Sequence, residues 1–393
     1  MLNKFLNDQS IQNRPLKLIY QYIYQNRSVS RADIINKTNL NRGKVARSLK
    51  ELLDKGYIQT VGYGDSEGGR PPSLYQINPI CSYIIGIQNT RVETKMALFD
   101  LNLNKLDEKK IIMTSKHKPQ IVIEEIKNTI TEFMKTYHFT VNELLGIGIG
   151  AIGPLDRERG IILKSEPFLT HSWNNIPIVE QIKSEFPARI KFDNAANTIV
   201  LGEYRNHQAY TNILNVTVGW TWGCGVILDR KLMRVESGDI SGYGHMVINM
   251  DGEKCYCGKN GCMTAYTSLY VILDKIKERS PGFFYEKLKD FAPAEQIINI
   301  ISEEDVRTKE VILDSAKYIG VGVANLATVF HSELVIVNGP LISQYPGYYE
   351  ETIHHISLNL NEQKNIQFRK GNFQSESGVL GAAVQVLDSY MNE

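Results

Sequence analysis

Apolar residues recur along this chain with two different periods. Near the N-terminus they repeat at helical spacing behind Pro15, and the apolar stripe of this first helix consists of Leu16, Ile19, Tyr20 and Ile23. Farther along they form short continuous runs that are typical of buried strands spaced by helices: YIIGIQ, ETKMALFDL, LLGIGIG, ILNVTVGW, CGVIL and ELVIVNG. The pattern predicts a small helical domain followed by a larger α/β body.

Capping signals predict two more short helices in the N-terminal domain. Ser30 is followed three residues later by Asp33, which is typical of a helix start. Asn41 can cap a third helix, residues 42–55, which Gly56 stops. One face of that helix is apolar, and the opposite face carries Lys44, Arg47, Ser48 and Glu51. Three short helices with a basic third helix match helix-turn-helix geometry.

Two strand-like runs, at 57–61 and 73–77, flank the sequence GYGDSEGGRPP, and we expect them to form a β-wing. With the third helix in the major groove of DNA, cationic and polar side chains can reach base edges or phosphates. The expected contacts come from Arg31, Asn41, Arg42, Lys44, Arg47 and Ser48. Arg70, between a glycine and a proline, would enter a narrow A·T-rich minor groove. The alternative is a small protein-interaction or dimerisation module.

Charge is distributed unevenly along the chain. The net charge is only +1, yet the first eighty residues hold twelve Lys and Arg against six Asp and Glu. A solvated helical face can produce such an excess, so charge alone does not identify a partner. Together with the helix spacing and the wing, it favours binding of double-stranded DNA.

Length and composition exclude several classes of protein. The 393 residues suffice for two or three domains with filled cores, and 42% hydrophobic with 22% charged residues is ordinary for a soluble protein. No apolar run approaches the roughly 18 residues of a membrane helix. The segment MLNKFLNDQS lacks the apolar core of a signal peptide. We therefore expect a cytoplasmic protein with no membrane partner.

A cluster of sulfur and imidazole ligands predicts a metal site. The spacing H-x9-C-x-C-x4-C is formed by His245, Cys255, Cys257 and Cys262. These ligand types suit a tetrahedral Zn²⁺, and Gly258 and Gly261 let the short loop fold around one ion. Four protein ligands leave no position for a reactive water, so the zinc would be structural. A redox thiol cluster and unliganded core cysteines are the alternatives, whereas the isolated Cys81 and Cys224 are expected to be packing residues.

With these motifs in hand, the sequence resembles the ROK family, whose members are bacterial sugar kinases or transcription regulators with an added winged helix. The resemblance rests on RADI, the third helix and GGRP near the N-terminus. In the body it rests on GIGAIGPLD, NTIVLGE, GHM…CYCGKNGC and GVLGAA. It implies an α/β, two-lobed actin-like (ASKHA/ROK) body with mixed five-stranded sheets and a cleft between the lobes.

The resemblance also implies a division of the chain into domains. Residues 1–80 would be the winged helix-turn-helix DNA-binding domain. Residues 81–195 would be lobe 1, completed by a C-terminal helix at 376–393. Residues 196–375 would be lobe 2, which carries the zinc motif.

The phosphate-binding loops depart from the pattern of the family's kinases. The first strand and turn, GIDIGGT in kinases, is GIQNTRV here, with Gln88 for the aspartate and Thr90 and Arg91 for two glycines. The second loop resembles GTGIG but is GWTWG, and a third reads VNGP, with Pro340 in place of glycine. Bulky side chains would stand where backbone N–H groups need to approach phosphates. We expect no ATP binding.

The catalytic motif departs in the same sense. Kinases of the family have NDAN, and this chain has Asn194-Ala195-Ala196-Asn197, so a methyl group occupies the place of the catalytic base. Asp193 is an alternative base, but it lies two residues upstream, which displaces its carboxylate by several ångströms. We therefore expect no enzyme activity.

The sugar site implied by the resemblance is altered in part. Gly242 and Thr264 replace two glutamates that accept sugar hydroxyls, whereas Asn194, Asn197 and His245 remain. These five residues are the candidate effector contacts, and a smaller or differently hydroxylated sugar is favoured over glucose.

These observations lead to one functional hypothesis with two alternatives. The favoured one is a homodimeric or tetrameric DNA-binding transcriptional regulator resembling the xylose-repressor-like ROK proteins. It would repress carbohydrate-utilisation genes at an inverted-repeat operator with A·T-rich flanks and respond to a sugar or sugar derivative. It would hold one structural Zn²⁺ per chain. The alternatives are a bifunctional sugar kinase and a regulator whose body senses a protein partner.

Overall fold

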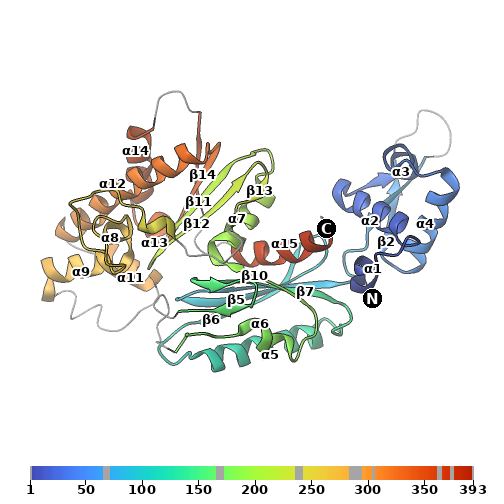
Figure 1. The fold of residues 1–393 in the computed structure, drawn as a ribbon, viewed down its shortest axis with the longest axis horizontal. Helices are drawn as coiled ribbons and strands as arrows, with labels where there is room; N and C mark the ends of the chain where they lie inside the picture. The colour runs from blue at the N-terminus through green and yellow to red at the C-terminus, as the bar shows by residue number, and fades with distance from the viewer. Residues whose placement is uncertain are drawn as a thin grey trace.

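The computed structural model describes residues 2–64, 71–164, 172–234, 242–282, 294–302, 306–360, 365–371 and 376–391. A small N-terminal domain is followed by a body built on two five-stranded sheets (Figure 1). Among the described helices, none has the length and apolar character needed to cross a membrane.

The N-terminal domain contains the three predicted helices and the wing. Its elements are α1 (Leu2–Asn7), α2 (Arg14–Asn26), β1 (Val29–Ser30), α3 (Arg31–Thr38), α4 (Arg42–Asp54), β2 (Ile58–Tyr63) and β3 (Ser73–Ile77). The strands form an antiparallel sheet in the order β1-β3-β2. Ser30 and Asp33 form a reciprocal capping box, and the Asn41 Oδ1 accepts the Lys44 N–H at 2.8 Å. The predicted caps of α3 and α4 are thus present.

Helix α1 was not predicted, because its six residues are too few to establish a period. Its apolar side chains are nevertheless buried, and the Phe5 ring stacks on Tyr57 with centroids 5.0 Å apart. The segment therefore belongs to the core of the N-terminal domain.

Lobe 1 is a mixed sheet in the order β10-β7-β4-β5-β6, covered by helices on both faces (Figure 1). Its elements are β4 (Tyr83–Asn89), β5 (Glu93–Phe99), β6 (Lys105–Ile112), α5 (Pro119–Thr136), β7 (Leu144–Ala151), β8 (Leu155–Asp156), β9 (Ile161–Ile162), α6 (Ile178–Lys183) and β10 (Arg189–Asn194). Because successive strand residues point to opposite faces, Ile85 and Ile87 pack with α5 and α6, whereas Ile84 packs with α15 (Ser377–Met391).

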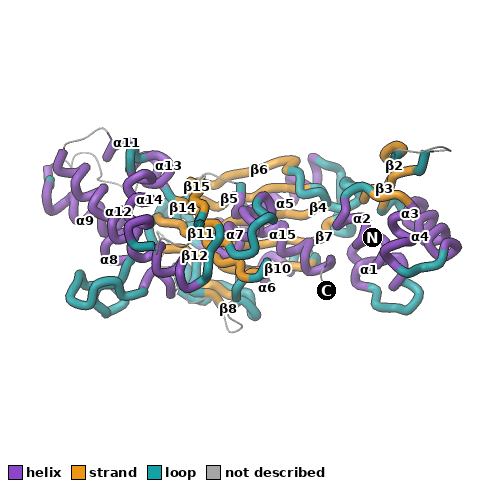
Figure 2. The backbone as a smooth tube through the Cα atoms, turned by 90° about the horizontal axis from the view of Figure 1, so that it is seen from above, coloured by secondary structure: helices purple, strands orange, loops and turns teal. Residues whose placement is uncertain are grey.

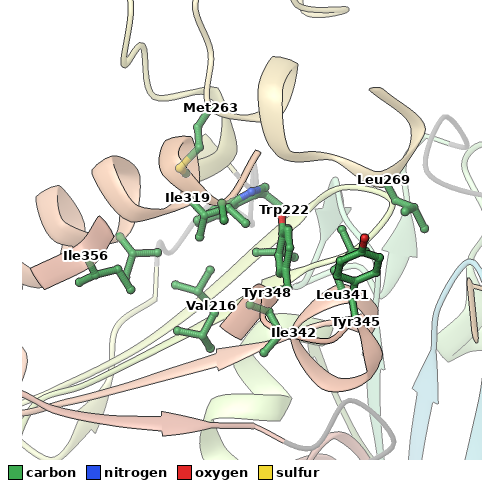
Figure 3. Close-up of a cluster of buried hydrophobic side chains, with 14 of the residues drawn as sticks. Val216, Trp222, Met263, Leu269, Ile319, Leu341, Ile342, Tyr345, Tyr348 and Ile356 are labelled. Atoms are coloured by element: carbon green, nitrogen blue, oxygen red, sulfur yellow. The ribbon is translucent and has the colours of Figure 1, made fainter. Parts of the chain in front are cut away.

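Lobe 2 repeats this architecture with the strand order β13-β12-β11-β14-β15. Its elements are α7 (Ala195–Asn206), β11 (Ile213–Val218), β12 (Trp222–Leu228), β13 (Lys231–Leu232), η1 (Gly242–His245), α8 (Thr264–Thr267), α9 (Leu269–Arg279), α11 (Ala294–Ser302), α12 (Val306–Val329), β14 (Leu334–Asn338), α13 (Pro340–Gln344), α14 (Tyr348–Leu358) and β15 (Gln367–Lys370). Figure 3 shows Trp222 and Tyr348 among the buried apolar side chains of this lobe.

Helices α7 and α15 cross in direct backbone contact and link the two sheets. A Cβ on Gly202 would lie 2.0 Å from the Ser377 carbonyl oxygen, and one on Gly381 would lie 1.7 Å from that of Thr198. Only glycine fits at these two positions. Helix α7 begins at Ala195 and packs against both α15, which covers the sheet of lobe 1, and β12, a strand of lobe 2. Since α7 contacts both lobes, the expected division of the body at residue 195 stays a prediction.

The N-terminal domain is seated on the C-terminal end of α15 (Figure 2). The Gln21 side-chain amide donates to the Met391 carbonyl at 3.1 Å. Arg189 donates to Asn7 Oδ1 at 2.7 Å, and its guanidinium lies 3.9 Å from the Tyr390 ring centroid. The buried residues of the N-terminal domain and of α15 form one continuous apolar cluster. The N-terminal domain thus shares a core with the body.

Candidate functional site

Helix α4 presents a basic surface on the N-terminal domain. Val45, Leu49 and Leu52 are buried, whereas Lys44 and Arg47 are exposed. At the start of the helix, Arg42 and Asn41 are exposed as well. The Arg31 guanidinium donates to the Arg42 carbonyl at 3.0 Å, which ties α3 to the first turn of α4. Helix α4 therefore has a hydrogen-bonded N-terminus and an exposed cationic face.

Ser48 is a correction to the predicted face. Only 5% of its surface is exposed, because at helical spacing it lies beside Val45 and Leu52 on the core side. A hydroxyl in that position cannot reach DNA. Arg70, the predicted minor-groove residue, lies outside the described residues.

The four predicted metal ligands come together in lobe 2. Their ligand atoms all lie within 4.8 Å of one another. Cys257 Sγ is 3.6 Å from Cys262 Sγ, and Cys255 Sγ is 3.4 Å from His245 Nδ1. Gly261 makes the loop possible, since its φ is +70° and a Cβ would meet the Asn249 carbonyl oxygen at 1.5 Å.

The donor set fits a tetrahedral zinc ion. Zn–S bonds of about 2.3 Å place two thiolates on one ion slightly under 4 Å apart, close to the observed sulfur separation. His245 Nε2 lies 3.0 Å from the Tyr256 hydroxyl, an arrangement that leaves Nδ1 directed at the sulfurs. Burial raises the pKa of the Cys262 thiol to about 12, and a bound cation would favour its thiolate instead. All four ligands come from the protein, so the site has a structural rather than a catalytic donor set.

Helix α7 starts at Ala195, the residue that the resemblance aligns with the catalytic aspartate of the kinases. Its carbonyl accepts a hydrogen bond from Gln88 Nε2 at 3.3 Å. The Thr198 hydroxyl lies 2.8 Å from Gln88 Oε1 and 2.9 Å from the Ala195 carbonyl oxygen. Gln88 and Thr198 are both buried. The Gln88 side chain therefore closes a buried hydrogen-bonded network between β4 and the start of α7.

Asp193 is fully engaged in structural contacts. It is 1% exposed, and its carboxylate accepts from Arg234 Nε at 2.7 Å and from Asn197 Nδ2 at 2.8 Å. It also accepts from the Asn194 backbone N–H at 2.8 Å. Because these contacts engage the carboxylate and only 1% of the residue is exposed, the carboxylate is not available to a bound substrate, which argues against the alternative base.

The loops at the nucleotide position pack on each other. Arg91, in the β4–β5 turn, places its guanidinium 4.6 Å from the centroid of the Trp220 ring in the β11–β12 turn. Burial lowers the pKa of Arg91. Trp222 is buried, and its indole N–H donates to the Thr267 hydroxyl at 2.7 Å. Side chains thus fill the region between the two turns.

The candidate effector residues lie in two groups. Asn194 caps α7 by accepting the Ala196 N–H at 2.8 Å, and Asn197 is bonded to Asp193. The second group surrounds η1 and contains Gly242, His245 and Thr264. Thr264 is 2% exposed and its hydroxyl donates to the Gly244 carbonyl at 2.7 Å. Its replacement of a glutamate therefore supports the η1 backbone and leaves little to offer a sugar.

Sequence reasoning missed Arg234. It pairs with a buried carboxylate that lies 41 residues earlier in the chain, and no local pattern marks such a partner. The fact that Asp193 is a buried acid at the end of a predicted strand was the one available signal that a cation must lie nearby.

The fold and these sites define a class, that of a winged helix-turn-helix domain joined to a two-lobed body of the sugar-kinase type. The sequence profile of the ROK family matches residues 84–389, and that of a winged helix-turn-helix DNA-binding domain matches residues 13–59. The chain belongs to the ROK family.

Known relatives include both regulators and kinases. The chain is 28% identical to the xylose repressor of Caldicellulosiruptor bescii over 389 residues, which cover 95% of this chain and 96% of that protein. A solved ROK family transcriptional regulator, a homologue of the Escherichia coli MLC protein, matches with a TM-score of 0.74 and 20% identity, over 96% of this chain and 98% of that one. A ROK glucokinase from Streptomyces griseus, solved with glucose and AMPPNP, matches with a TM-score of 0.63 and 21% identity, over 77% of this chain and 99% of that one. The two structural likenesses establish the fold.

Proposed function

We propose that this ROK protein is a DNA-binding transcriptional regulator that represses carbohydrate-utilisation genes through a non-catalytic body. The observation that carries the proposal is the combination of an exposed cationic α4 with a kinase-like body that has Ala195 at the position of the base. Similarity to a named xylose repressor over nearly the whole chain supports the choice of a repressor.

On DNA, α4 enters the major groove with Arg42, Lys44 and Arg47 toward bases or phosphates. Arg31 and Asn41 hold the start of α4 and lie at the surface where a phosphate would pass. Arg70 would reach the minor groove beside the site, so its removal is expected to weaken binding most on A·T-rich flanks. Such domains read paired half-sites, which requires a dimer or tetramer and an inverted-repeat operator.

In the body, two features support a role without phosphoryl transfer, and the metal cluster has a separate, structural role. The place of the catalytic base is a methyl group, and the nearest carboxylate, Asp193, is held by Arg234. The Arg91–Trp220 stack occupies the region where phosphate loops would hold ATP. The His245 and cysteine cluster, with one structural Zn²⁺ per chain, would brace η1 next to the cleft.

The body then acts as an effector and dimerisation domain. A sugar or sugar derivative would bind beside the start of α7 and η1, near Asn194, Asn197, Gly242 and His245. Regulation requires that the ligand favour one relative position of the lobes, because a ligand with equal affinity for both conformations shifts nothing.

The experiment is a gel-shift titration of an operator with full-length protein, repeated with a panel of mono- and disaccharides. Sequence-specific retardation that one sugar weakens is the expected result. Specific retardation that no sugar alters would instead favour a body that senses a protein partner. Sugar-dependent ATP turnover in a coupled assay would favour the bifunctional kinase.

A further inference from the structure

A cavity of about 790 Å³ lies along one side of the molecule, between the edge strands of the two sheets. Strand β10 and the β12–β13 turn form two of its sides, and helices α7 and α15 form its floor. None of the five candidate effector residues lines it. It adjoins these residues through Asp193, which accepts hydrogen bonds from Asn194 and Asn197.

The walls of the cavity carry more positive than negative charge. Six cationic side chains line it: Arg157, Lys191, Arg205, Arg230, Lys231 and Arg234. Three carboxylates do so as well, of which Glu158 is exposed at the rim. Asp193 pairs with Arg234, and the six cations outnumber the three carboxylates even after this pair is set aside. An excess of cations therefore faces the cavity.

We propose that this cavity binds a small phosphorylated ligand and links it to the DNA-binding domain. The volume is in the range of pockets that enclose a sugar phosphate or a mononucleotide. Arginine guanidinium groups are well suited to hold phosphate oxygens in paired, charge-assisted hydrogen bonds.

Two contacts connect the cavity wall to the N-terminal domain. Arg205 lines the cavity from α7, its guanidinium bonds to the hydroxyl of Tyr24 in α2, and its charge lies near the Asp388 carboxylate in α15. Ser389, also in the wall, accepts from Arg189 Nη1 through its carbonyl at 2.6 Å, and the same guanidinium donates to Asn7 of α1. Both sets of contacts therefore end on helices of the N-terminal domain, α2 in the first case and α1 in the second.

A phosphate that bonded to Arg205 would compete with the Tyr24 hydroxyl for the same guanidinium. The seating of α2 on α15 would then differ between the free and the bound protein. That difference is the requirement for coupling between a ligand and DNA, because the two states then have different ligand affinities.

Isothermal titration calorimetry on the full-length protein tests the site. The probes are inorganic phosphate, a hexose 6-phosphate and AMP, with glucose as the neutral control. At least one phosphorylated probe is expected to bind while glucose produces no heat at this site. The comparison between the hexose 6-phosphate and AMP identifies which source of phosphate the cavity accepts.

Three substitutions test whether the probe binds in the cavity. Arg205→Gln is expected to lower the affinity for the phosphorylated probe about tenfold or more. Lys231 is exposed at the rim of the cavity, so Lys231→Gln leaves the fold intact. This substitution is expected to lower the affinity for the probe by a smaller but measurable factor. Arg369→Gln, on β15 at the opposite edge of lobe 2, is the matched control and should change nothing. Absence of binding by every probe, or equal affinity in wild type and both cavity variants, would overturn the proposal.

The link to DNA is tested separately and rests on the proposed regulator function. Tyr24→Phe removes the hydroxyl that competes for Arg205, so it should leave probe affinity at or above that of wild type while reducing the effect of the probe on operator affinity. An undiminished effect in Tyr24→Phe would overturn this route. Calorimetry needs no DNA, so failure of the site and failure of the regulator hypothesis give different results.

Discussion

The guanidinium of Arg91 stands 4.6 Å from the centre of the Trp220 ring and joins a turn of lobe 1 to a turn of lobe 2. The resemblance to the family's kinases places both residues in turns that would carry phosphate-binding loops. This cation–π pair therefore holds the β4–β5 turn against the β11–β12 turn.

This pair should be measurable as a coupling energy. In a double-mutant cycle of Arg91→Ala and Trp220→Ala, we expect a coupling of about 0.5–2 kcal/mol in the free energy of unfolding. Urea denaturation of the four proteins provides the values. Strictly additive effects of the two substitutions would show that the side chains do not interact in solution.

Restoring the catalytic aspartate alone should not restore a kinase. Ala195→Asp supplies a carboxylate at the base position, but Arg91 and Trp220 still occupy the phosphate region. We expect neither wild type nor the variant to consume ATP in a coupled assay with a sugar panel. Turnover by either protein would contradict the assignment of a non-catalytic body.

The DNA face of α4 makes contrasting predictions for two residues one position apart. Arg47→Ala should weaken specific DNA binding by about 1–3 kcal/mol if the side chain reads a base, as measured by fluorescence anisotropy. Ser48→Ala should leave operator affinity within about twofold, because the hydroxyl is 5% exposed and faces the core. Equal losses in the two variants would mean that α4 lies on DNA in another orientation.

Metal content distinguishes the cysteines. Cys257→Ser should abolish stoichiometric zinc in the purified protein and lower its melting temperature, since binding energy of a structural ion is folding energy. Cys224→Ser changes a buried cysteine in β12 outside the cluster and should leave zinc content unaltered. Elemental analysis with thermal unfolding measures both effects. A zinc-free wild-type protein, or full zinc content in Cys257→Ser, would refute the site.

Features with a local cause could be predicted from the sequence. The caps at Ser30 and Asn41 and the strand pair of the wing depend on residues close in the chain, and they occur where the pattern placed them. The zinc ligands also came together as predicted, because three of them lie within eight residues of one another.

Features that depend on tertiary packing could not be predicted. The substitution of Arg91 was visible, but its partner Trp220 lies 129 positions away in the other lobe. Ser48 was placed on the wrong face because its small polar side chain gives little signal beside the apolar stripe. The cationic cavity draws on residues from Arg157 to Ser389, and no sequence period brings these together.

Selection of DNA from a pool of randomised duplexes by the full-length protein tests the central claim most directly. The account predicts enrichment of an inverted repeat whose half-sites lie about one helical turn, or a small multiple of it, apart. It also predicts that the Arg47→Ala protein, taken through the same rounds, enriches this repeat weakly or not at all. A wild-type selection that yields no shared sequence would contradict the assignment of this protein as a DNA-binding regulator.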